Sequence, residues 1–129
     1  MTKKQIEREV GRWQELLSLR DWKIEVVCIE ADQINDDGDQ ANVRRRLYTR
    51  RATITIAHKR NAEELTKSIV HELLHLVLAE VDNVFEETRN RLTEPAWTLA
   101  DHLYNDCLER AIDCTAGALV TLDKKTGGD

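Results

Sequence analysis

Apolar residues recur at helical spacing at the start of the chain. Ile6, Val10, Trp13 and Leu17 follow one another at steps of three or four, with charged residues between them. A helix completes a turn about every 3.6 residues, so this spacing puts the four side chains on one face. The pattern predicts an amphipathic helix over residues 3–18.

Three segments have the pattern of strands. Residues 22–29 alternate between apolar and polar side chains before the run becomes wholly apolar. Residues 43–48 and 52–57 are the next candidates, and the second of them alternates cleanly and is rich in β-branched residues. The aspartate-rich segment 30–42 between these strands predicts a solvated turn.

Two longer helices are predicted in the second half of the chain. The first runs over residues 61–81, beginning near Asn61 with acidic residues in its first turn. Residues 82–92 are polar and form either a further helical piece or a connection. Thr93-Glu94-Pro95 is typical of a helix start, because proline is tolerated in a first turn, and the last helix extends to about residue 118.

These elements predict an α+β fold: an N-terminal helix, a small three-stranded sheet, and two later helices. A chain of 129 residues with 41% apolar and 33% charged residues suits one domain, which we expect over residues 1–120. Residues 121–129 are expected to be a disordered tail.

The most specific chemical signal is His71-Glu72-Leu73-Leu74-His75, an HExxH motif inside the predicted helix 61–81. Two histidines four positions apart lie one turn apart on the same helix face, so both imidazoles can bind one metal ion. Glu72 projects beside that face and can act as general base on a metal-activated water. The motif predicts a zinc-dependent hydrolase.

A catalytic zinc usually takes three protein ligands, and the last helix offers candidates for the third. His102, Asp106, Glu109 and Asp113 follow at steps of four, three and four, so they form one polar stripe. We expect Glu109 to be the ligand and Asp113 to orient a ligand histidine by accepting a hydrogen bond. His102 and Glu94 are the alternative third ligands.

The motif and the Glu109-Arg110-Ala111-Ile112-Asp113 segment resemble the gluzincin metallopeptidases, and the chain is similar to small HExxH proteins of minimal-gluzincin type from phages and bacteria. More distantly it resembles SprT-like proteins, in which His102 would complete a three-histidine site, and ImmA-like proteins. The resemblance implies a zincin-like fold, with a glutamate helix after the motif helix, and peptide-bond hydrolysis. By the same resemblance, strand 52–57 would be the edge along which an extended substrate lies.

A hydrolase of this kind needs a donor for the oxyanion of the transition state, and His102 and Tyr104 are candidates by residue type. Its partner would be a protein or peptide substrate. Three rival functions stay open: a SprT-like protease acting on DNA-bound proteins, a regulatory protease with a single partner, and a non-catalytic domain that zinc stabilises.

Five arginines gather in one short stretch: Arg44, Arg45, Arg46, Arg50 and Arg51. They form either a basic edge that prevents pairing with other sheets or a contact surface for an acidic substrate or nucleic acid. The net charge of −5 gives no general attraction to nucleic acid or membrane.

The chain has three cysteines, Cys28, Cys107 and Cys114. An odd, sparse set favours a reducing compartment. Cys107 and Cys114 share a helix face, which predicts that they are small core residues. The N-terminus begins an amphipathic pattern, not an apolar signal region, and no segment reaches the length of a membrane span. We therefore expect a cytoplasmic protein.

Overall fold

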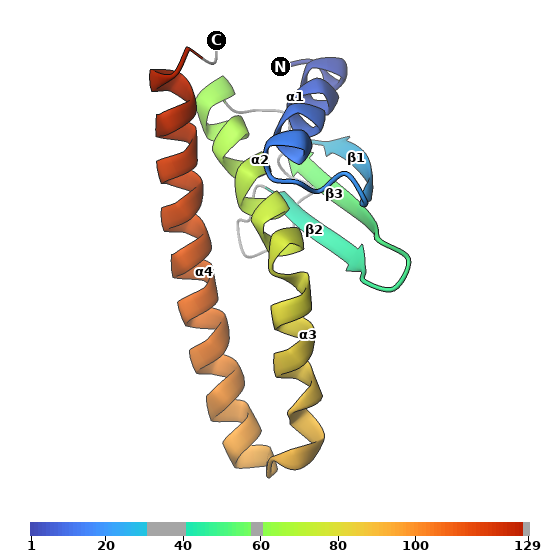
Figure 1. Ribbon diagram of the computed structural model, residues 1–129, viewed down its shortest axis with the longest axis vertical. Coiled ribbons are helices and arrows are strands. Elements are labelled where there is room, and N and C mark those ends of the chain that lie inside the picture. Colours follow the sequence, from blue (N-terminus) through green and yellow to red (C-terminus); the bar gives the residue numbers. More distant parts are fainter. Residues whose placement is uncertain (31–40, 58–60, 128–129) are drawn as a thin grey trace. The chain divides into compact units, whose positions relative to one another are not determined.

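The computed structural model describes residues 1–30, 41–57 and 61–127. It confirms the α+β prediction, with four α-helices and one three-stranded mixed sheet in the described residues (Figure 1). The elements are α1 (Lys3–Leu16), β1 (Lys23–Ile29), β2 (Ala41–Arg46), β3 (Arg51–Ala57), α2 (Ala62–Val77), α3 (Ala79–Glu87), the short 3₁₀ helix η2 (Arg89–Arg91) and α4 (Glu94–Lys125). Most of the predicted turn at 30–42, namely residues 31–40, lies outside the described residues.

The chain divides into two compact units, Met1–Val77 and Leu78–Asp129. The first unit holds α1, the sheet and α2, and the second holds α3, η2 and α4. The single domain expected over residues 1–120 stays a prediction. None of the helices in the described part of the chain is long and apolar enough to cross a membrane.

The sheet of the first unit has the order β1-β3-β2, with β1 parallel and β2 antiparallel to β3. The segment 52–57, expected to be the edge along which a substrate lies, therefore forms most of the central strand, and that expectation is wrong. The many β-branched residues of this segment are typical of a strand that is paired on both sides. The edges of the sheet are β1 and β2.

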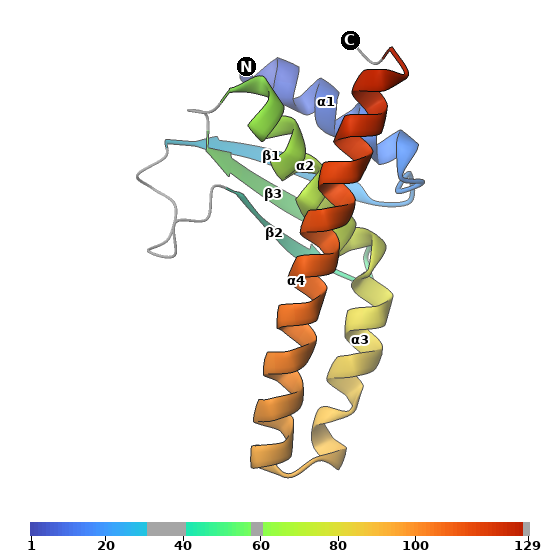
Figure 2. The ribbon, with the colours of Figure 1, turned by 90° about the vertical axis from the view of Figure 1, so that its left-hand side faces the viewer.

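One face of the sheet is buried under α1 and α2 (Figures 1 and 2). Because side chains alternate between the two faces of a strand, every second residue of β3 points into this core. Ala52, Ile54 and Ile56 are all buried, and Val26 of β1 lies beside Ile54. Trp13 of α1 belongs to the same apolar core.

Helix α2 begins where the sequence indicated. The Asn61 side chain accepts a hydrogen bond from the backbone N–H of Glu64 at 2.8 Å, which caps the helix. The helix ends at Val77, however, and Leu78, with φ −96° and ψ 9°, separates it from α3. The expected single helix over 61–81 is therefore two helices. Neither glycine nor proline marks the break. The hydrophobic pattern of the sequence runs through it without interruption, and it therefore predicted one helix.

The second unit is a helical hairpin held by aromatic contacts. Phe85 of α3 stacks on Trp97 and on Tyr104 of α4, with ring centroids 5.0 Å and 4.1 Å apart. The Tyr104 hydroxyl donates a hydrogen bond to buried Asp82. The Thr93 side chain caps α4, as predicted, by accepting from the backbone N–H of Ala96.

Helix α4 continues seven residues beyond the predicted end near 118, through Lys125. The prediction of a disordered tail is therefore wrong for residues 121–125. The buried positions Ile112, Ala116 and Val120 recur every four residues and carry the helix onward, and lysines in the last turn suit the helix dipole. Gly127, with φ +84°, ends the described segment.

Candidate metal centre

The HExxH motif occupies the C-terminal half of α2, and its two histidines lie on the least buried side of that helix. Leu65, Ile69, Leu73 and Leu76 are essentially inaccessible, and they fix α2 in the core of the first unit. The stripe Glu64, Ser68, His71, His75, at steps of four, three and four, stays exposed or half-buried. The packing of α2 therefore leaves the two imidazoles on its one polar face.

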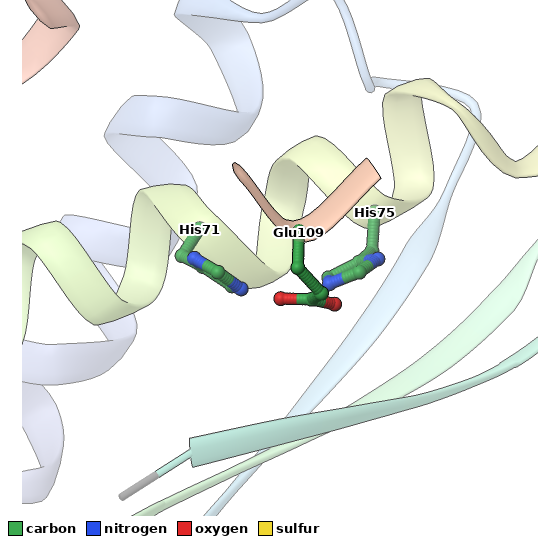
Figure 3. Close-up of side chains that lie close together, drawn as sticks. All are labelled: His71, His75 and Glu109. Atoms are coloured by element: carbon green, nitrogen blue, oxygen red, sulfur yellow. The ribbon is translucent and has the colours of Figure 1, made fainter. Parts of the chain in front are cut away.

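The two histidines lie close enough to share a metal ion. Their ring centroids are 5.3 Å apart and the rings are inclined by 59° (Figure 3). Both side chains are half-buried, so part of each imidazole stays accessible to a metal ion. A pair of histidines at i and i+4 on a rigid helix needs little reorganisation to bind a metal. Folding has already ordered both side chains, which lowers the entropic cost of binding.

Glu72 lies between the histidines in sequence and is only 8% exposed. It is one of two buried charged residues in the described part of the chain, and the other is Asp82. A carboxylate in such surroundings interacts more strongly with a proton donor than it would in water. The motif thus combines two metal-binding imidazoles with a sequestered base.

Glu109, the predicted third ligand, lies on α4 in the second unit, whereas His71 and His75 lie on α2 in the first. Its side chain is exposed. Two imidazoles with one carboxylate are a known catalytic zinc set, so the residue types fit the metal. The role of Glu109 as the third ligand stays a prediction.

The other predicted site residues also lie on α4. Glu94, His102 and Glu109 line one open groove of about 690 Å³ in the second unit, so the groove includes both alternatives for the third ligand. Asp113 is exposed one turn beyond Glu109. Tyr104, proposed by residue type as a transition-state donor, uses its hydroxyl to bond Asp82.

Asp82 has a structural importance that the sequence analysis missed. It lies on α3, is 8% exposed, and accepts the Tyr104 hydrogen bond that ties α3 to α4. The spacing along the sequence could have indicated that Asp82 is buried. It falls three residues after the buried Ala79, on the same face of the helix. A buried carboxylate needs a hydrogen-bond donor as its partner.

The cysteines do not belong to the metal centre. Cys107 and Cys114 are exposed, so the prediction that they are core residues is wrong. The buried stripe of α4 passes through Ile112, and Cys114 lies two residues, or about 200°, further round the helix. Cys28 is half-buried in β1. Desolvation raises the pKa of its thiol; nearby Lys3 lowers that pKa and Glu7 raises it.

No family model matches the chain, and no curated protein or solved structure matches it either.

Proposed function

We propose that the chain is a zinc-dependent peptidase that uses Glu72 as its general base. The observation that carries the proposal is the polar stripe of α2: in a helix otherwise packed into a core, the accessible face presents His71 and His75, with Glu72 buried beside them. This is the arrangement that hydrolysis with a metal-activated water needs.

His71, His75 and Glu109 would hold the zinc ion. Two imidazoles and one carboxylate form a known catalytic set, which leaves the fourth position of the metal for water. Bound zinc would supply an activated water and polarise the scissile carbonyl. Asp113, one turn beyond Glu109, is proposed to orient a ligand histidine through its second ring nitrogen.

Glu72 would take a proton from the attacking water and later give it to the leaving amine. Its burial supports this role, because a dry environment strengthens the interaction of its carboxylate with the proton that it accepts. Since the Tyr104 hydroxyl is bonded to Asp82, His102 is the better candidate for stabilising the oxyanion. The proposed substrate class is protein or peptide, in the cytoplasm.

The decisive variant is Glu72→Gln, which keeps the shape of the side chain but removes the base. We expect it to bind zinc like the wild type and to lose peptide hydrolysis by at least about 100-fold, the usual size of a general-base contribution. The measurement pairs elemental analysis with cleavage of an unfolded protein such as casein.

Glu64→Gln is the matched control, because Glu64 lies on the same stripe of α2 but in its first turn. Its hydrolysis should be unchanged. Undiminished cleavage by Glu72→Gln would contradict the mechanism. Stoichiometric zinc with no hydrolysis by the wild type would favour the rival, a non-catalytic domain that zinc stabilises.

A further inference from the structure

The basic end of the sheet is not explained by the metal centre. The sequence placed five arginines together, but the strand register separates them by face. Arg45 pairs with buried Ala52 and so belongs to the helix-covered face. The Arg50 guanidinium is 3.8 Å from the Asp21 carboxylate and lies over the Trp22 ring. Arg50 is therefore engaged within the first unit, and Arg45 is half-buried.

The remaining three arginines join Lys23 on the opposite face. Lys23 of β1, Arg51 of β3 and Arg46 of β2 stand directly side by side across the three strands. Neighbouring strands are about 4.8 Å apart, so the backbones of these three cationic residues follow one another at about that spacing. Arg44, two residues before Arg46, points to the same face. We call Lys23, Arg44, Arg46 and Arg51 the cationic row.

All four side chains of the cationic row are exposed, and among the described residues none forms an ion pair with a carboxylate. They line an open cavity of about 760 Å³ together with Ile24, Glu25, Arg45, Ala52 and Thr53. Glu25 is the one carboxylate among the described residues of that lining. A protein with net charge −5 thus concentrates positive charge on one small surface.

Protection of a sheet edge does not account for this arrangement. Lysine and arginine on an edge strand prevent pairing with other sheets, and that role suits Arg44 and Arg46 on β2. Arg51, however, belongs to the central strand β3, which has no free edge. A cation in that position, aligned with cations on both neighbours, is better explained by an anionic ligand lying across the sheet.

The β2–β3 turn adds an aromatic group to the cationic row. Tyr48, between Arg46 and Arg51 in sequence, is 91% exposed. An aromatic side chain beside a basic surface offers a stacking platform for an unpaired base, a combination typical of single-strand binding. Guanidinium groups bind phosphate oxygens in pairs of hydrogen bonds. An acidic peptide would use the cations but not the aromatic ring.

We propose that the cationic row and Tyr48 bind single-stranded nucleic acid, with phosphates on the row and a base stacked on the Tyr48 ring. The surface lies entirely within the first unit, and its role is independent of the metal. It would place the chain on a nucleic-acid strand through contacts with the backbone, without reading sequence.

The test is fluorescence anisotropy of the full chain with a labelled oligothymidylate of about 12 nucleotides, titrated at several salt concentrations. Four phosphate contacts predict that the logarithm of affinity falls with the logarithm of salt with a slope of about −3. Arg46→Gln and Arg51→Gln should each reduce the steepness by about 0.7. Arg8→Gln, which removes an exposed arginine of α1, should leave the slope unchanged.

Tyr48→Ala should weaken oligothymidylate binding about fivefold or more by removing the stacked ring, whereas Tyr48→Phe should bind like the wild type. Absence of binding at low salt would overturn the proposal. So would an affinity for a polyglutamate peptide equal to that for the oligonucleotide, which would identify an acidic protein partner. Equal binding of a duplex, unaffected by Tyr48→Ala, would overturn the assignment to single strands.

Discussion

At the scale of single residues, the proposed site lies where side chains break the hydrophobic pattern. Glu72 is buried in a helix whose other buried side chains are apolar, and His71 and His75 lie half-buried on its polar stripe. Residues of one motif therefore differ in burial, with Glu72 buried and both histidines half-buried, because successive residues of a helix point to different sides.

The cysteines give a prediction at the residue scale. Cys107 and Cys114 are exposed, whereas Cys28 is half-buried and desolvation raises its pKa above the usual value. The thiolate is the reactive form, so Cys28 should be alkylated much more slowly at pH 8 than the other two. Rates with iodoacetamide, followed by peptide mass spectrometry, measure this.

The pH dependence of Cys28 has a definite sign. A raised pKa means that the folded protein holds the thiol proton more tightly, so this contribution to stability is present below the unfolded pKa and is lost as the pH rises through the folded value. Alkylation of Cys28 should accordingly accelerate at higher pH than that of an unfolded control. Equal rates for all three cysteines at pH 8 would contradict the burial of Cys28.

At the scale of elements, one buried polar contact adds to the aromatic contacts that hold the α3–α4 hairpin. Tyr104→Phe keeps the ring that stacks on Phe85 but removes the hydrogen bond to Asp82. Hydrogen bonds to a charged group are worth about 1.5–3 kcal/mol, so we expect unfolding in urea to show a loss of that size. Tyr48→Phe is the control, since Tyr48 is 91% exposed; equal stability of the two variants would contradict the role of the Asp82 contact.

The sequence predicted where helices and strands lie when a local signal, such as a helix cap, marks them. The predictions were wrong where no local signal exists. Helices α2 and α4 start where the sequence predicted, and the Asn61 and Thr93 side chains cap them by accepting hydrogen bonds from backbone N–H groups of the first turn. The break at Leu78 has no such marker. Strand order depends on pairing between distant segments, so alternation in 52–57 identified a strand but could not show that it is central.

The candidate site was predictable to the same extent. His71, Glu72 and His75 are fixed by their spacing on one helix, which needs no knowledge of tertiary structure. The third ligand comes from a separate helix, and spacing alone could not choose among Glu94, His102 and Glu109. Likewise Lys23 could not be linked with Arg51, because only the parallel register of β1 and β3 brings them side by side.

At the scale of the whole molecule, the chain consists of two compact units, and the candidate functional residues are divided between them. The first unit contains the HExxH helix and the cationic row, and the second contributes the acidic face of α4. The proposed third ligand, Glu109, belongs to the second unit. Zinc that binds the native protein but not the unfolded chain would stabilise the native state. The gain is about 2.7 kcal/mol when the free zinc concentration is a hundred times the dissociation constant.

The measurement that tests the account most directly is zinc stoichiometry by elemental analysis of the wild type, Glu109→Ala and Asp106→Ala. Asp106 is the control, because it is an exposed acidic residue of α4 that pairs with Arg110. We predict about one zinc per chain in the wild type and in Asp106→Ala, and a clear loss in Glu109→Ala. Equal zinc in all three would move the third ligand to His102 or Glu94, and a wild type that binds no zinc after reconstitution would contradict the proposed function.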